Sequence, residues 1–319
     1  MMDLFWTLLL LSFSAGSCLV IPISAARPAQ SLSGVILDRV ILHEDSAATT
    51  TSKANKNNNN DDDVVSVDVG KSLLETSGAQ KTLLIVGTHC ADFNMVEYAQ
   101  KANIYWSKLK EQGISRCILI MNGTPSSCRK LALLLDLDSD IEILSDPTGK
   151  AGLSFGVSSG FRPDDANLSP WIKVTVVGLG LGPPWMTLPA VLPGYFGDPN
   201  GKRDWIEAGL KQGQLAGRWP AVLELDGSNN IVGNKFDDFP LFSGWGRRPF
   251  ELATLRLQNL VSIQLKHWDE LKPVDDKCLT QLGGCAVVGA DGVTLYSWVD
   301  RGLCDVPDIE GILEALALS

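Results

Sequence analysis

Cys90 is the residue in this sequence best suited to chemistry. It ends the stretch Gly87-Thr88-His89-Cys90, between an expected strand and an expected helix, and parallel α/β sheets place functional sites at such strand ends. A thiol near a helix N-terminus loses its proton more readily than free cysteine, because the amide dipoles favour the thiolate. His89 is expected to add a positive charge, whereas Asp92 opposes the thiolate. A cysteine packed as a small apolar side chain is the competing interpretation.

Cys128 is the second candidate, as a thiol that resolves an oxidised Cys90. It falls in the first turns of the next expected helix, at the same edge of the sheet, so neighbouring parallel strands are able to bring it towards Cys90. A helix cysteine without a redox role is the alternative. Cys117 and Cys285 lie within apolar strand runs and are expected in the core. Cys278 and Cys304 flank the closing hairpin and are able to pair in an oxidising compartment.

The composition excludes several other kinds of site. Seven cysteines and three histidines without CxxC or HExxH spacing give no zinc or c-type haem motif. The formal net charge of −10 argues against a nucleic-acid partner, which requires clustered Lys and Arg. We therefore expect a protein that works with neither a metal ion nor nucleic acid.

The spacing of hydrophobic residues after residue 81 predicts the strands and helices that position Cys90. Three short apolar runs alternate with three helical patterns, which specifies a parallel, right-handed βαβαβα sheet. Asn94 and Glu97 are expected to form the capping box of the first helix, and Gly113 to end it. Thr124-Pro125 is expected to open the second helix. The expected strands are 82–86, 117–121 and 141–144, and the expected helices are 95–109, 125–135 and 147–155.

The end of the chain completes this order. Strand runs at 284–288 and 293–299 are joined through Ala290-Asp291-Gly292, which is typical of a hairpin. A last helix is expected over residues 308–318. Three βα units followed by a hairpin and a closing helix predict an α/β protein with a thioredoxin-like fold.

Residues 158–280 form a long insertion before this hairpin, too long for a structureless loop. A hairpin is expected over residues 221–236, and a long amphipathic helix after Arg247-Arg248-Pro249. Its expected buried stripe is Phe250, Ala253, Leu257 and Leu260. The uncharged stretch 174–197 contains several Gly and Pro residues, so we expect it to pack over the sheet and not to contact a membrane. Clusters of Arg beside Trp suit anion or flat-ring recognition, or a structural stacked contact.

The first 80 residues differ in composition from the rest. Residues 1–26 have the layout of a signal peptide, with an uncleaved membrane anchor as the alternative. Residues 27–80, rich in Ser, Thr and Asn, are expected to be a disordered linker or a transit-like extension for plastid import. The predicted domain is therefore 81–319, and no membrane contact is expected beyond the anchor alternative.

The chain resembles the AhpC/TSA (alkyl hydroperoxide reductase/thiol-specific antioxidant) family, in a peroxiredoxin-like branch found in photosynthetic organisms. The resemblance covers residues from Lys81 to the C-terminus. It rests on short matches at Asp92-Phe93 with Glu97-Tyr98-Ala99, Asp146-Pro147 with Phe155-Gly156-Val157, Gly194-Tyr195-Phe196-Gly197-Asp198, Arg248-Pro249-Phe250-Glu251-Leu252-Ala253-Thr254-Leu255-Arg256-Leu257, and Leu279-Thr280-Gln281-Leu282-Gly283-Gly284. Peroxiredoxins proper carry Pro-x-x-x-Thr-x-x-Cys, whereas here one residue separates Thr88 from Cys90 and the proline is absent, so only Cys90 maps onto that motif.

The resemblance implies a thioredoxin-like fold and an antioxidant or thiol-redox role without metal or organic cofactor. Because the branch is found in photosynthetic organisms, it also favours a location in the plastid. The first hypothesis is a thiol peroxidase or oxidoreductase, in which Cys90, flanked by Thr88 and His89, attacks a peroxide or disulfide and is resolved by Cys128 or by a reducing thiol protein. The second is a catalytically inactive binding or assembly protein of the plastid that holds a partner with its Trp- and Arg-rich insertion. Plastid delivery through the signal peptide is expected, with secretion or membrane anchoring as alternatives.

Overall fold

The computed structural model of the 319-residue chain describes residues 28–42, 64–74, 81–180, 186–187, 204–236 and 248–317. The expected signal peptide lies outside these residues, as do His43 and most of the stretch between the two first strands. Within the described residues, no helix has both the length and the apolar character needed to cross a membrane.

One mixed sheet organises the described chain, with the strand order β2-β1-β5-β4-β3-β8-β9. The β3, β4 and β5 strands run parallel, and each of the other neighbouring pairs is antiparallel. This arrangement confirms the predicted α/β class. The strands are β1 (Ile36–Val40), β2 (Val64–Asp68), β3 (Lys81–His89), β4 (Ile114–Asn122), β5 (Ile141–Ser145), β8 (Gly284–Val288) and β9 (Thr294–Val299).

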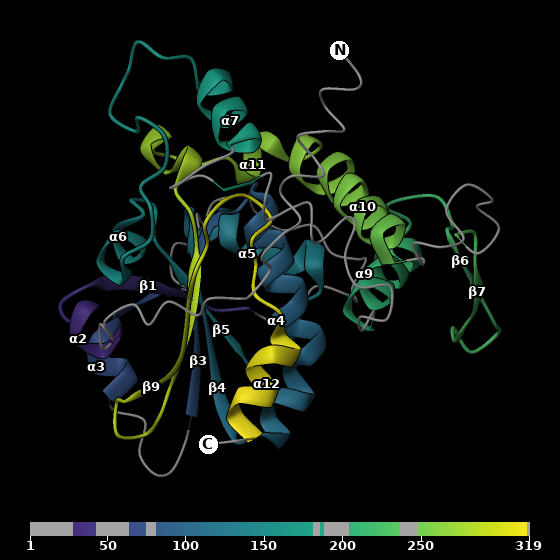
Figure 1. Cartoon of the computed structure of the whole chain (residues 1–319), viewed down its shortest axis with the longest axis horizontal. Coiled ribbons are helices and arrows are strands. Elements are labelled where there is room, and N and C mark those ends of the chain that lie inside the picture. Colours follow the sequence, from purple (N-terminus) through teal and green to yellow (C-terminus); the bar gives the residue numbers. More distant parts are fainter. Residues whose placement is uncertain are drawn as a thin grey trace, which may run out of the picture.

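Helices cover both faces of the sheet (Figure 1). On one face lie α4 (Phe93–Glu111), α5 (Pro125–Leu135) and α12 (Ile309–Ala317), and on the other lie α2 (Pro28–Ser31), α3 (Val69–Leu74) and α6 (Lys150–Phe155). Successive side chains of a strand point to opposite faces, so Leu83 and Ile85 join one core and Leu84 and Val86 join the other. Because both faces are buried, the central strands are continuously apolar in sequence.

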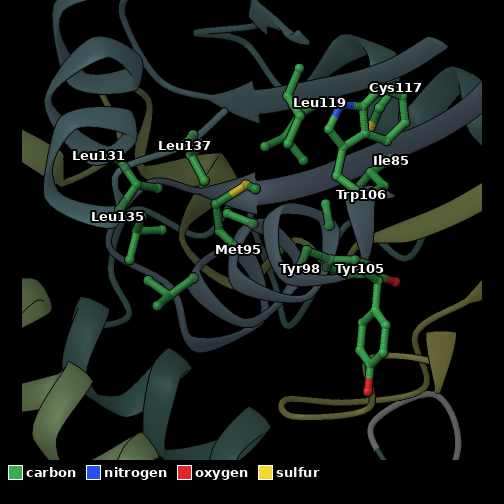
Figure 2. Close-up of a cluster of buried hydrophobic side chains, with 14 of the residues drawn as sticks. Ile85, Met95, Tyr98, Tyr105, Trp106, Cys117, Leu119, Leu131, Leu135 and Leu137 are labelled. Carbon is green, nitrogen blue, oxygen red and sulfur yellow. The ribbon is translucent and has the colours of Figure 1, made fainter. Parts of the chain in front are cut away.

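The larger core lies between the sheet and the helices α4 and α5. Figure 2 shows its aromatic and aliphatic side chains packed together in one cluster. The labelled members are Ile85, Met95, Tyr98, Tyr105, Trp106, Cys117, Leu119, Leu131, Leu135 and Leu137.

The structure corrects the prediction that residues 27–80 are only a linker. The β1 strand pairs with β5 and β2 pairs with β1, so both belong to the main sheet. The β1 strand buries Leu37 and Val40, and α3 buries Val69 and Leu73. These short segments gain their order from pairing and burial against distant parts of the chain, which local composition does not reveal.

The insertion carries regular elements, as predicted: α7 (Pro170–Leu179), α9 (Asp204–Leu215), β6 (Leu223–Leu225), β7 (Ile231–Asn234), α10 (Arg248–Asn259), the π-helical η1 (Leu260–Leu265), α11 (Trp268–Leu271) and the 3-10 helix η2 (Asp276–Thr280). The hairpin and the long helix are confirmed, but the predicted buried stripe is wrong at Leu257, which is 58% exposed. Leu252 and Leu255 are buried instead, because α10 packs against both α4 and α9.

Candidate functional site

The site forms where three parallel strands end. Cys90 follows the last residue of β3, Gly123 follows the last residue of β4, and Ser145 is the last residue of β5. Thr124 caps α5 with its side chain, and Pro125 occupies the first turn, as predicted. The first turns of α5 then bring Cys128 to the same edge, which is where parallel sheets gather functional groups.

Cys90 and Cys128 lie side by side. Their sulfur atoms are 3.9 Å apart, and the Cys128 thiol also lies 3.9 Å from the backbone oxygen of Met121. A disulfide has a sulfur–sulfur bond of about 2.05 Å, so the two residues are free thiols that a small movement would join. The structure thus brings together the two cysteines that the sequence singled out.

Gly123 makes this approach possible. A Cβ atom at this position would lie 2.7 Å from the Cys90 sulfur and 3.7 Å from the Cys128 sulfur. Any larger residue would therefore push the thiols out of their present positions.

The turn between β3 and α4 does not expose Cys90 to solvent. Neither Cys90 nor Cys128 has any exposed surface. The expected capping box at Asn94 and Glu97 is wrong, because Asp92 is the N-cap of α4 and its side chain accepts a hydrogen bond from the Asn94 backbone. The helix therefore begins earlier than predicted, and the loop that carries Cys90 is short and packed inside.

His89 does not supply a positive charge at neutral pH. Burial lowers the pKa of His89 to about 4, against a smaller opposing effect of a hydrogen bond with the Leu279 backbone. Its ring stands edge-on to Trp268, with 6.1 Å between centroids, and its Nε2 lies 3.8 Å from the Asp92 carboxylate. The expectation of a cation beside Cys90 failed because β3 extends through His89 and buries it.

Thr88 and Asp92 complete the buried polar group. Burial raises the pKa of Asp92 to about 6, and hydrogen bonds from the Asn94 backbone and the Thr88 side chain partly offset this rise. Thr88 is fully buried.

Cys128 is the thiol of the pair that keeps its proton. The pKa of Cys128 lies well above its ordinary value, because of its hydrogen bond with Cys90, its burial, and the negative charges of Cys90 and Asp146. The nearby Ser145 side chain acts in the opposite direction on this pKa.

The other cysteines described are buried or half-buried and free. Burial raises the pKa of Cys117, Cys278 and Cys304 to about 12, and that of Cys285 well above its usual value. The predicted core positions of Cys117 and Cys285 are confirmed. These thiols are poor nucleophiles where they stand.

Two residues of the site were missed by sequence reasoning. The Ser145 hydroxyl donates a hydrogen bond of 2.7 Å to the backbone oxygen of Gly123, and Gly123 leaves room for both thiols because it has no Cβ atom. A sequence signal for them exists, since both stand at the ends of predicted parallel strands. Small and polar residues at such ends are candidates for a shared site.

The Arg–Trp cluster at Arg218 and Trp219 is a structural contact. The Arg218 guanidinium lies 5.3 Å from the Trp219 ring centroid and bonds to the Leu134 backbone oxygen. Within the described residues, no cluster of His, Cys, Asp and Glu is arranged to hold a metal ion. No family model, curated protein or solved structure matches this chain.

Proposed function

We propose that this chain is a thiol-based antioxidant or thiol–disulfide oxidoreductase in which Cys90 and Cys128 are the redox pair. The 3.9 Å between their sulfur atoms carries this proposal. Two free thiols in the segments that follow neighbouring parallel strands are placed to form a disulfide without rearrangement of the sheet.

With a hydroperoxide, the Cys90 thiolate attacks one peroxide oxygen. A sulfur–oxygen bond forms, the oxygen–oxygen bond breaks, and the alcohol or water leaves after taking up a proton. The Cys128 thiolate then attacks the Cys90 sulfur, the hydroxyl leaves as water, and a disulfide remains. An external reducing thiol protein returns two electrons and restores both thiols.

A thioredoxin-like fold and membership of the peroxiredoxin-like AhpC/TSA branch are part of the same proposal. In its support, β3 and β4 run parallel beside the antiparallel β8–β9 hairpin, and α12 closes the chain. Cys90 stands between the first of these strands and its helix. Plastid delivery through residues 1–26 is a further part of the proposal, and a fluorescent fusion of residues 1–80 tests it.

A second function is favoured by one observation, the complete burial of both thiols. A sulfur without exposed surface cannot meet a protein disulfide unless the structure opens. On this alternative the chain is a catalytically inactive thioredoxin-fold binding or assembly protein of the plastid.

Peroxide consumption in the presence of a reducing thiol separates the two functions. The wild type should consume hydrogen peroxide, Cys90→Ala should not, and Cys128→Ala should retain a Cys90 sulfenic acid that dimedone traps. Cys304→Ala is the control, because this half-buried thiol has no role in the reaction. Equal and negligible consumption by the wild type and Cys90→Ala would favour the binding protein.

A further inference from the structure

We propose that the buried side chains of Asn122 and His89 bind the hydroperoxide that Cys90 reduces. This inference rests on the proposed function and deepens it, because it states where the substrate lies and how large it is. The two residues end the neighbouring parallel strands β4 and β3. Each stands one position before a residue of the thiol site, Gly123 on one strand and Cys90 on the other.

Asn122 carries the first observation. Its side chain is 1% exposed, yet neither its amide oxygen nor its amide nitrogen has a hydrogen-bond partner among the residues that the structure describes. A carboxamide offers two donor hydrogens and one acceptor oxygen, and leaving all of them unpaired inside a protein destabilises the fold. Buried polar side chains of native proteins are nearly always paired, so this amide is suited to a bound molecule.

His89 presents a second unpaired polar atom beside Asn122. The two residues are paired in the β3–β4 ladder, and paired residues of neighbouring strands project from the same face of a sheet. His89 is 3% exposed, and its Nδ1 atom has no hydrogen-bond partner within the described part of the chain. Its ring is neutral near neutral pH, because burial lowers the pKa of His89 to about 4. A neutral ring and an amide suit an uncharged ligand that both donates and accepts hydrogen bonds.

The strand geometry sets this polar pair next to the reactive sulfur. The β3–β4 ladder shifts its register between Val86 and His89, and such irregularities re-aim side chains beside active sites. The residues that follow the pair meet at the thiols, since a Cβ atom on Gly123 would lie 2.7 Å from the Cys90 sulfur. The unpaired polar atoms and the sulfur are therefore adjacent along both strands.

A small hydroperoxide matches these groups. It is uncharged, its hydroxyl donates a hydrogen bond and both of its oxygens accept one. With the ring proton of His89 on Nε2, the nitrogen that lies 3.8 Å from the Asp92 carboxylate, Nδ1 accepts the hydrogen bond of the peroxide hydroxyl. Both binding residues are buried and the Trp268 ring stands edge-on to His89, so the site selects hydrogen peroxide over a bulky organic hydroperoxide.

The two side chains act on the first step of the reaction. The Cys90 thiolate attacks the near oxygen of the bound peroxide, a sulfur–oxygen bond forms and the oxygen–oxygen bond breaks. Negative charge then develops on the far oxygen, and the Asn122 amide donates a hydrogen bond to it. This oxygen takes up the proton that the thiol gave up and leaves as water. Without the amide, the sulfenic acid of Cys90 forms more slowly.

The test replaces Asn122 with leucine, which has a similar shape and no polar atom. In the Cys128→Ala background, the rate constant for oxidation of Cys90 by hydrogen peroxide, followed by dimedone trapping, should fall at least about tenfold. Alkylation of Cys90 by iodoacetamide should keep its rate, because this reagent does not need the peroxide site. The wild type should react faster with hydrogen peroxide than with tert-butyl hydroperoxide, and the opposite order would overturn the inference.

Asn259→Leu is the matched control. Asn259 is also buried, but its amide donates a hydrogen bond of 3.0 Å to Gln100, farther along α4. This variant should lower the free energy of unfolding and leave the oxidation of Cys90 unchanged. Asn122→Leu should be at least as stable as the wild type, because it removes an unpaired buried amide. An unchanged rate of oxidation in Asn122→Leu, or an equal fall in its rate of alkylation, would overturn the inference.

Binding is also measurable without turnover. In a protein with both Cys90→Ser and Cys128→Ser, the NMR signals of the Asn122 side-chain amide should shift saturably as hydrogen peroxide is added. The signals of the Asn259 amide should stay in place, because that amide is already bonded. Unshifted Asn122 signals would overturn the inference. Failure of the wild type to consume peroxide while these signals shift would instead overturn the proposed function and leave the binding site standing.

Discussion

The sulfur of Cys90 lies 3.9 Å from the sulfur of Cys128, although the two residues are 38 positions apart in the sequence. The β3–α4 connection places one thiol and the first turns of α5 place the other, so the contact depends on the parallel pairing of β3 with β4. Both thiols are inside the protein.

Mild oxidation should join these two residues. We expect diamide to produce a Cys90–Cys128 disulfide, and peptide mapping by mass spectrometry to find it in the intact fold. Closing this loop should raise the free energy of unfolding by up to about 4 kcal/mol, because it restricts the unfolded chain. A disulfide between other cysteines would contradict the geometry.

Substitution of Gly123 should separate the thiols. Gly123→Ala places a methyl group 2.7 Å from the Cys90 sulfur, so oxidation by diamide should yield the disulfide more slowly. Gly227→Ala is the matched control, because a Cβ atom there meets no other atom within 4 Å. Equal rates in both variants would show that the site tolerates a larger residue at position 123.

Access to the thiols should depend on α11, which packs against α5. Glu270 of this helix lies 3.1 Å from Lys130 on α5. Glu270→Gln should therefore speed iodoacetamide labelling of the two thiols up to about fivefold, since an exposed ion pair contributes about 0.2–1 kcal/mol and labelling follows local opening. Asp269→Asn removes the neighbouring pair with Lys272 and should leave the labelling rate unchanged.

The insertion should prove integral to the stability of the domain. Arg256 of α10 makes two hydrogen bonds, of 3.1 and 2.9 Å, to the buried Glu97 of α4. Arg256→Met should lower the free energy of unfolding by about 3 kcal/mol, because it leaves a buried carboxylate with fewer partners. Lys108→Met removes the exposed pair with Asp204 and should cost less than about 1 kcal/mol in urea unfolding.

Asp300 should make stability depend on pH. Burial raises the pKa of this carboxyl to about 8, against the opposing hydrogen bonds from Tyr98 and Asn94. The folded state then binds more protons than the unfolded state, so its stabilising effect is complete below the unfolded pKa near 4 and is lost as the pH rises through about 8. Asp300 thus contributes up to about 1.4 kcal/mol per pH unit to the fall of the unfolding free energy with rising pH.

Asp300→Asn should therefore flatten the fall of the unfolding free energy between pH 4 and pH 8. Its control is Asp226→Asn, since the pKa of Asp226 is lowered by hydrogen bonds from Asn230 and Ser228. The effect of Asp226→Asn should be confined to pH values near 4 and below. Parallel curves for the wild type and Asp300→Asn between pH 4 and pH 8 would contradict the prediction.

The sequence by itself determined the elements from residue 81 onwards. The strands β3, β4 and β5, the helix opened by Thr124 and Pro125, and the closing hairpin all follow from hydrophobic period and turn residues, which act over a few neighbouring positions. Parallel sheets gather functional groups where their strands end, and this rule placed Cys90 and Cys128 at one edge of the sheet. These features are local in origin, so one sequence was enough to predict them.

Only the tertiary structure decided the state of the site. The β1 and β2 strands complete the sheet because distant strands pair with them. The complete burial of Cys90, the neutral His89 and the hydrogen bond from Ser145 to Gly123 arise because segments far apart in the sequence exclude water from the same small volume. Burial sets the charge of a titratable group and the partners of a hydroxyl, and burial is a property of the packed chain that no local pattern contains.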